Sequence, residues 1–153
     1  KEILTFGDVI DEAFLENPPD LYDGTNNFID FCKSREIKIG IISNTGFNSP
    51  KVYRKFLHNN NVEYDAISLS NELGTAKPNS KIFHSTLHSL NSNPKDVIHF
   101  GDNPVADILG ALNVGMSAVL ISKNGEKSPV NNSHMAVIND ISFAIDIISF
   151  WRQ

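Results

Sequence analysis

Hydrophobic positions divide this chain into alternating helical and strand-like segments. Apolar residues recur at helical spacing in residues 1–17, with acidic residues between them, and Pro18-Pro19 ends the pattern. Residues 37–42 are nearly all apolar, which is typical of a strand buried on both faces of a parallel sheet. Further strands are predicted at residues 65–70, 97–100, 117–121 and 135–138, and further helices at residues 26–36, 50–58, 79–90, 104–112 and 141–150.

The order of these elements predicts the fold class. Strand and helix alternate after Pro19, so we expect an α/β domain with a doubly wound, Rossmann-like parallel sheet and helices on both faces. Such a sheet binds its ligands beyond the carboxyl ends of its strands. Candidate functional residues are therefore sought in the loops that follow strands.

Composition narrows the class of partner and the compartment. The length of 153 residues suits one domain, and a net charge of −5 without a Lys/Arg cluster argues against nucleic acid or an anionic membrane as partners. Neither a transmembrane-length apolar run nor a secretory signal is evident, so a cytoplasmic location is expected. The single cysteine, Cys32, excludes an internal disulfide and is expected to be a small buried hydrophobe.

The stretch from Val97 to Asp107 carries the clearest candidate chemistry. The predicted strand turns at Gly101 and presents Asp102, while Asn103 suits the N-cap of the next helix and Asp107 its first turn. Two carboxylates held so close repel each other unless a cation lies beside them, and Mg²⁺ prefers oxygen ligands. We expect a divalent metal site at Asp102 and Asp107, with ordinary helix capping as the alternative.

Two other loops carry groups that suit a phosphate ligand. Residues 43–46, Ser-Asn-Thr-Gly, follow the strand at 37–42, and a hydroxyl with successive backbone N–H groups can bind phosphate oxygens. For these four residues alone, however, a plain turn with a helix cap is the preferred interpretation. A lone lysine in a loop is usually solvated, but Lys77, fixed by Pro78, can supply a point charge for phosphate. His84 and His88 stand one helical turn apart without the glutamate of a zinc-protease motif, so we expect them at the surface or at its boundary with the core.

Taken in order, these loops resemble the second, third and fourth motifs of the haloacid dehalogenase (HAD) superfamily, whose members are mostly Mg²⁺-dependent phosphatases. The resemblance covers roughly residues 21–121. The matching segments are residues 39–46, residues 74–78 with Ile82-Phe83, and residues 101–107 with Gly110-Ala111 and Gly115-Met116.

The resemblance implies a role for each matching position. Ser43 would hydrogen-bond the transferring phosphoryl group, with Asn44 and Thr45 beside it in the substrate-binding loop. Lys77 would neutralise phosphoryl charge. Asp102 would ligate Mg²⁺, and Asp107 would hold the metal site in shape. Ser43, Lys77 and Asp102 would thus be the catalytic residues, which agrees with phosphoryl transfer as a matter of positioning and charge stabilisation.

The first motif of the family, an Asp-x-Asp-x-Thr that supplies the nucleophile, has no match in residues 1–23. Asp23-Gly24-Thr25 lacks a preceding strand and is interpreted as a decoy. By resemblance, the missing strand lies between the strands that end at Ser43 and Phe100, and its absence would leave a gap lined by apolar side chains and unpaired backbone groups. We therefore expect a truncated chain, with residues 1–19 the remnant of a helical cap and residues 20–153 the HAD-like core.

The leading hypothesis is a Mg²⁺-dependent phosphoester hydrolase that acts on a small phosphorylated metabolite and is complete in its parent. The alternative is a catalytically inactive HAD-fold binding or interaction module. A phosphoacceptor receiver domain fits less well, because Lys123 is a poor candidate for its late-strand lysine. The substrate, the oligomeric state, and the choice between phosphatase, dehalogenase and phosphonatase chemistry stay open.

Overall fold

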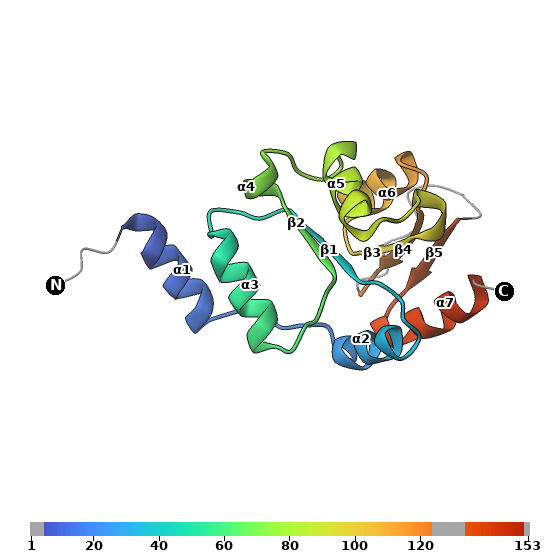
Figure 1. The fold of residues 1–153 in the computed structure, drawn as a ribbon. Helices are drawn as coiled ribbons and strands as arrows, with labels where there is room; N and C mark the ends of the chain where they lie inside the picture. Colours follow the sequence, from blue (N-terminus) through green and yellow to red (C-terminus); the bar gives the residue numbers. More distant parts are fainter. Residues whose placement is uncertain (1–4, 124–133, 152–153) are drawn as a thin grey trace.

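The computed structural model describes residues 5–123 and 134–151, and its strands form parallel sheets (Figure 1). Strand β1 (Gly40–Ser43) pairs with β2 (Ala66–Leu69), and β3 (Ile98–Gly101), β4 (Ser117–Ile121) and β5 (Met135–Ile138) pair in that order. Every strand expected from the sequence is present. The prediction of a parallel α/β domain is therefore confirmed.

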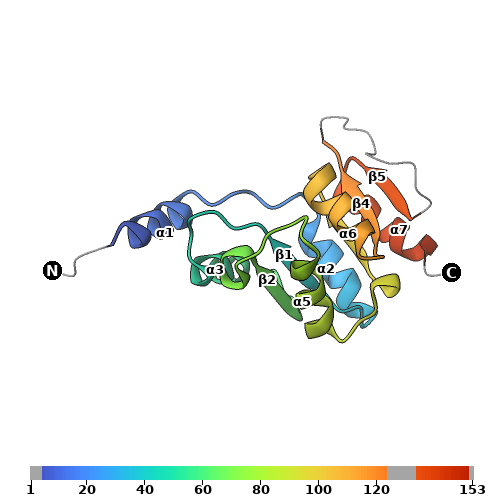
Figure 2. The same ribbon diagram turned by 90° about the horizontal axis from the view of Figure 1, so that it is seen from above.

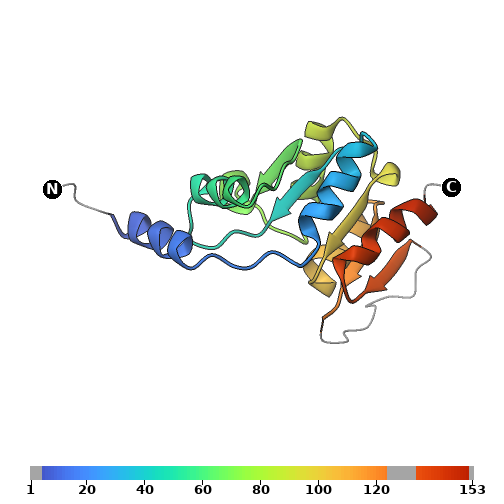
Figure 3. The ribbon, with the colours of Figure 1, turned by 90° about the horizontal axis from the view of Figure 1, so that it is seen from below.

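Helices cover both faces of these strands. Helices α2 (Thr25–Ser34) and α7 (Ala144–Trp151) lie on one face, and α5 (Ser80–Leu90) and α6 (Gly110–Asn113) lie on the other, as the views from above and below show (Figures 2 and 3). Side chains of β4 are buried on both sides, in two separate hydrophobic clusters. Burial on both faces explains why this strand reads as a continuous apolar run.

Helix α1 (Phe6–Glu16) stands apart from the sheet, beside α3 (Pro50–Asn59) (Figure 1). Not one residue of α1 is fully buried. The ring of Phe14 packs on the rings of Tyr53 and Phe56, with centroids 5.3 and 5.7 Å apart, and Asp11 accepts hydrogen bonds from the N–H (2.8 Å) and the hydroxyl of Ser49. This helix is thus docked on α3 rather than on the core.

Some short elements differ from the prediction. Helix α4 (Ser70–Leu73) and the 3₁₀ turn η1 (Pro94–Asp96) were not expected. The helix after Asn103 begins as a wide π-helical turn, η2 (Pro104–Leu109), and the closing helix begins with a 3₁₀ turn, η3 (Ile141–Phe143). Most of the predicted polar loop at 122–133 lies outside the described residues. None of the described helices combines the length and the apolar character needed to cross a bilayer.

A cavity divides the sheet. Among the described residues, no strand joins β1 to β3, and a cavity of about 500 Å³ lies between residues 39–42 and residues 97–100. We call this cavity the interstrand slot. Helix α5 lines it on one face, and α2 and α7 line it on the other. Its place coincides with the gap expected between the strands that end at Ser43 and Phe100.

Candidate active site

The Lys77 side chain links the carboxyl ends of the two half-sheets. Its Nζ donates a hydrogen bond to the backbone carbonyl of Ile42 in β1 at 2.9 Å, and another to Oδ1 of Asp107 at 2.5 Å. Only 12% of the Lys77 side chain and 5% of the Asp107 side chain are exposed. This ion pair is therefore largely shielded from water, and it brings together two of the residues singled out in the sequence.

Both carboxylate oxygens of Asp107 have partners. The Nε2 of His99 lies 3.2 Å from Oδ1, and the N–H of Asn103 donates to Oδ2 at 3.0 Å. Burial by itself raises the pKa of this carboxyl, but the contact with His99 and the charge and hydrogen bond of Lys77 outweigh it, so the pKa lies well below its usual value. Asp107 is therefore ionised at neutral pH.

The backbone around Asp107 shows why these residue types occur where they do. Asn103 is the N-cap, as predicted, and its Oδ1 accepts from the N–H groups of Val105 (3.0 Å) and Ala106 (2.8 Å). A Cβ at position 101 would lie only 2.3 Å from Cγ of Asp107. Glycine at 101 is therefore what allows the Asp107 carboxylate to lie against the end of β3.

Gly101→Ala is expected to lower the free energy of unfolding by about 1–3 kcal/mol, because the new methyl group must displace the buried carboxylate. Urea unfolding followed by circular dichroism measures this loss. The control is Gly46→Ala, where the added Cβ meets no atom within 4 Å and a change of no more than about 0.5 kcal/mol is expected. Equal effects at the two positions would contradict the steric role of Gly101.

The loop after β1 is held in place by its own polar side chains. The Asn44 amide donates to the backbone carbonyl of Lys77 (2.9 Å) and accepts from the N–H of Lys77 (2.7 Å). The N–H of Thr45 donates to the Ser70 hydroxyl (2.9 Å), and the two hydroxyls lie 3.1 Å apart. Asn44 and Thr45 therefore fix the loop through these groups, and Ser43 precedes them as the half-buried last residue of β1. Their roles toward a substrate stay predictions.

Asp102 is exposed at the carboxyl end of β3. The hydroxyl of Tyr22 lies 3.4 Å from its Oδ2, which is longer than an ordinary O–H···O hydrogen bond. Nζ of Lys123 lies 4.2 Å from the centroid of the Tyr22 ring. Asp102 is therefore an exposed residue that is held much less tightly than Asp107.

The two aspartates, Asp102 and Asp107, fit a Mg²⁺ ion that takes few ligands from the protein. In the part of the chain that the structure describes, no group of three His, Cys, Asp or Glu residues could hold a metal ion. Mg²⁺ commonly takes one or two protein carboxylates and completes its shell with water and phosphate oxygens. The exposed Asp102 suits a direct ligand, whereas Asp107, with both oxygens already engaged, suits a group that orients the site.

Other sequence expectations have clear outcomes. Cys32 is buried, with 3% exposure, and His84 and His88 are exposed on α5, as predicted. Asp23 lies in the turn before α2 and follows no strand, in agreement with its interpretation as a decoy. The contact of His99 with Asp107 was not predicted from the sequence. A single polar side chain within an otherwise apolar strand was the only signal for it.

Comparisons with known proteins place this geometry in a family. The model of the haloacid dehalogenase-like hydrolase family matches residues 3–121. The chain is 34% identical over 133 residues to the glyceraldehyde 3-phosphate phosphatase of Methanothermobacter thermautotrophicus, and the matched region covers 81% of this chain and 56% of that protein. It is also 34% identical over 93 residues to the pyrimidine 5'-nucleotidase YjjG of Escherichia coli, and this matched region covers 60% of this chain and 41% of that protein. The chain spans about half the length of these curated relatives.

Solved structures agree on the fold. A HAD phosphatase from Thermococcus onnurineus superposes with a TM-score of 0.79 at 24% identity, over 91% of this chain and 64% of that chain. A 2-haloacid dehalogenase from Pseudomonas syringae superposes with a TM-score of 0.75 at 21% identity, over 92% of this chain and 59% of that chain. At these identities the likeness shows the fold alone. Together with the match to the family model, it shows that the chain belongs to the haloacid dehalogenase-like hydrolase family.

Proposed function

We propose that this chain forms the core of a Mg²⁺-dependent phosphoester hydrolase that acts on a small phosphorylated metabolite. The observation that carries the proposal is the largely buried side chain of Lys77, which is fixed between Ile42 and Asp107 at the carboxyl ends of the strands, where Asp102 is also presented. Phosphoryl transfer needs fixed positive charge and hydrogen-bond donors more than it needs covalent chemistry from the protein. This edge of the sheet carries such groups.

Each group has a definite task in this proposal. The Ser43 hydroxyl and the backbone N–H of Asn44 hydrogen-bond the phosphoryl oxygens, and Lys77 stabilises the charge that develops on them. The Asn44 side chain and Asp107 hold the lysine in place from two sides. Mg²⁺ bound at Asp102 would supply Lewis-acid stabilisation of the phosphoryl group.

In the same proposal, the nucleophilic carboxylate comes from a strand that fills the interstrand slot. Residues 1–19 then belong to a helical cap and residues 20–153 to the catalytic core. The proposal is supported by α1, which packs on α3 and buries none of its residues fully, and by the greater length of the curated relatives. An in-frame Asp-x-Asp-x-Thr in the coding DNA upstream of Lys1 would supply that strand.

The substrate class rests on the curated relatives. Both relatives are named for the removal of phosphate from small molecules, a sugar phosphate in one case and a nucleotide in the other. We therefore assign a small phosphorylated metabolite to this site. The alternative, a catalytically inactive binding module, is favoured by one observation, which is that the nucleophile motif has no match in residues 1–23.

Asp102→Asn in the complete gene product is expected to lower kcat for a generic aryl phosphate by at least about 10²-fold and to abolish the response to Mg²⁺, with little change in stability because Asp102 is exposed. Phosphate release at increasing Mg²⁺ concentrations measures both effects. Residues 1–153 alone are expected to show no turnover.

Asp23→Asn is the matched control, since Asp23 is an exposed aspartate that follows no strand, and it should leave turnover unchanged. Loss of activity in Asp23→Asn would identify that residue as the nucleophile and contradict our assignment. Metal-dependent turnover that survives Asp102→Asn would refute the metal assignment. A complete gene product that hydrolyses no phosphomonoester would favour the inactive binding module.

A further inference from the structure

We propose that His99 is a positioning residue of the active site, which holds the Asp107 carboxylate in place and, through it, the ammonium group of Lys77. The inference deepens the proposed function and rests on it for what Lys77 does to the phosphoryl group. His99 is assigned no contact with substrate or metal. Its effect on the reaction is expected to pass entirely through Lys77.

The hydrogen bond between His99 and Asp107 has a defined direction. Asp107 is ionised at neutral pH, because its pKa lies well below the usual value, and an ionised carboxylate can only accept hydrogen bonds. The Nε2 atom of His99, 3.2 Å from Oδ1, must therefore carry the hydrogen. The charge of the acceptor strengthens this bond, and so does burial, since only 11% of the His99 side chain and 5% of the Asp107 side chain are exposed.

Two donors share one oxygen of Asp107. Nζ of Lys77 and Nε2 of His99 both bond to Oδ1, while the N–H of Asn103 bonds to Oδ2. The last torsion of an aspartate side chain is soft, so the backbone does not fix where Oδ1 lies. Its hydrogen-bond donors fix that position instead. Without His99, the carboxylate can turn about this torsion, and the long side chain of Lys77 moves with it.

His99 itself is firmly held. It lies within β3 and is in register with Ala118 of β4. Its ring packs edge to face on the ring of Phe83, which is fully buried. A group on a paired strand, with its ring held by packing, is placed more precisely than a group on a loop. His99 therefore presents its donor to Asp107 from a fixed position.

The residue type also favours this role. Burial of a polar ring costs free energy unless the ring is hydrogen-bonded, and the neighbours of His99 in the strand, Ile98 and Phe100, are apolar. An apolar side chain at position 99 would pack against Phe83 without that cost. The hydrogen bond to Asp107 is what histidine supplies here and an apolar residue does not.

The test compares two substitutions of His99 in the complete gene product. His99→Gln keeps an N–H donor at a similar reach, whereas His99→Leu fills much of the space without a donor. His99→Leu is expected to lower kcat for a generic aryl phosphate by at least about tenfold and to change KM by less than about twofold, because a lysine displaced by about 1 Å loses much of its effect on the transition state. His99→Gln should keep kcat within about threefold of the native value.

A matched control separates positioning from a general loss of stability. Thr86 is buried in α5, and its hydroxyl donates to Ser68 at 2.7 Å. It lies beside Gly40, at the end of β1 remote from Ser43. Thr86→Val also removes one buried hydrogen bond and should leave kcat within about twofold at a temperature where circular dichroism shows all variants folded. If Thr86→Val lowers kcat as much as His99→Leu does, the inference is overturned.

A double-mutant cycle shows whether His99 acts through Lys77. In the Lys77→Met background, His99→Leu should lower kcat by no more than about a further twofold, because no ammonium group is left to position. Losses that multiply would show that His99 affects the reaction by another route, and they would overturn the inference. An equal loss of kcat in His99→Gln and His99→Leu would overturn it as well.

Crystal structures of the variants give a readout that does not depend on catalysis. Nζ of Lys77 should stay within hydrogen-bond distance of Asp107 in His99→Gln and should be displaced, or take more than one position, in His99→Leu. An undisturbed Lys77 in His99→Leu would overturn the inference and leave the proposed function standing. A displaced Lys77 in a gene product that hydrolyses no phosphomonoester would support the positioning role and refute the proposed function. If His99→Leu fails to fold, His99→Asn, whose amide is too short to reach Asp107, takes its place.

Discussion

Asp107→Asn is expected to lower the free energy of unfolding by about 3–5 kcal/mol, because it leaves the charge of Lys77 buried without a counterion. The asparagine keeps the size of the side chain and an oxygen that can still accept from Asn103, so the loss comes chiefly from the uncompensated charge. Urea unfolding at neutral pH, with a chelator present, measures it.

Two comparisons isolate the charge effect. Lys77→Met combined with Asp107→Asn removes both charges and should recover much of the stability lost in the single variant. Glu72→Gln breaks the Arg54–Glu72 pair, whose side chains are 39% and 37% exposed, and should cost no more than about 1 kcal/mol. A double variant no more stable than Asp107→Asn would show that the ion pair is not the cause.

The difference in the free energy of unfolding between the native protein and Asp107→Asn should also depend on pH. The folded-state pKa of Asp107 lies below its usual value, so the unfolded chain binds this proton more readily than the folded chain does. The stabilisation is therefore fully present above the ordinary carboxyl pKa of about 4 and is lost as the pH falls toward the folded-state pKa. The two unfolding curves should be far apart at pH 7 and approach each other at acidic pH.

Phe83→Ala is expected to cost about 3–5 kcal/mol, since the side chain is fully buried and its removal leaves a cavity. The ring meets the His99 ring edge to face, with centroids 5.3 Å apart, and lies against Gly110, where a Cβ would be 2.7 Å from its Cζ. Phe83 thus supports α6 and the strand beneath Asp102 together. Thermal and urea unfolding should both show the loss.

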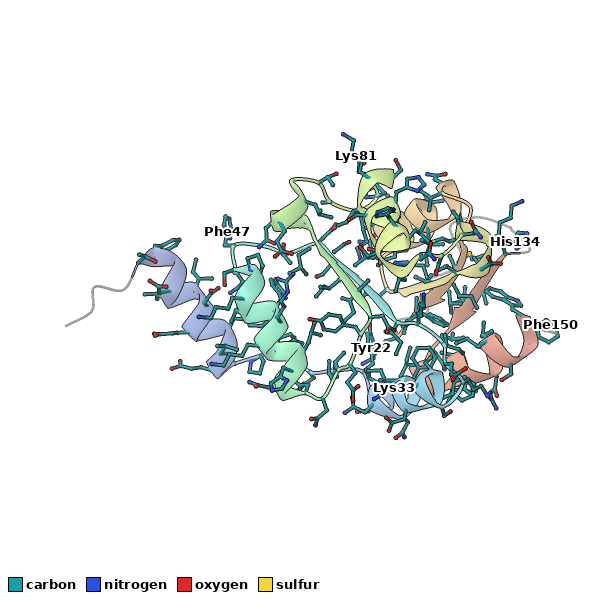
Figure 4. All side chains as sticks on the ribbon, in the orientation of Figure 1. Tyr22, Lys33, Phe47, Lys81, His134 and Phe150 are labelled. Atoms are coloured by element: carbon teal, nitrogen blue, oxygen red, sulfur yellow. The ribbon has the colours of Figure 1, made fainter. Side chains whose placement is uncertain are left out.

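Phe47→Ala is the matched control, because the same atoms are removed from a side chain that is 90% exposed and projects from the loop after β1 (Figure 4). A change of no more than about 0.5 kcal/mol is expected there. A small effect at Phe83 would mean that the core around α5 is far less tightly packed than the contacts indicate.

The local sequence pattern predicted the bounds of two strands correctly. The bounds of β4 and β5 match the expected segments, because each is an apolar run between polar residues. Strand β1 begins at Gly40 rather than at residue 37. The N–H of Ile39 donates to the Asp65 side chain, although the carbonyl of Ile39 still accepts from the backbone N–H groups of Asp65 and Ala66. Helix α4 has only four residues, too few to show a helical period.

The sequence indicated where candidate site residues lie but not how they contact each other. Ser43, Lys77 and Asp102 lie at or after the ends of predicted strands, and Asp107 lies in the first turn of a predicted helix. Their roles toward a substrate stay predictions. The clamp of Asn44 on the Lys77 backbone joins residues 33 positions apart, and no local pattern contains that pairing. The partnership of His99 with Asp107 likewise depends on which face of β3 the histidine occupies.

The open slot has a consequence for how this chain behaves at high concentration. Unpaired strand edges are templates for pairing with other chains, and natural proteins ordinarily cover or pair them. In our proposal, residues 1–153 without the added strand present two such edges facing one cavity. A segment that supplies the nucleophile would therefore also protect the protein from aggregation. Mutations in the apolar part of that segment would then reduce the solubility of the protein more readily than its catalytic activity.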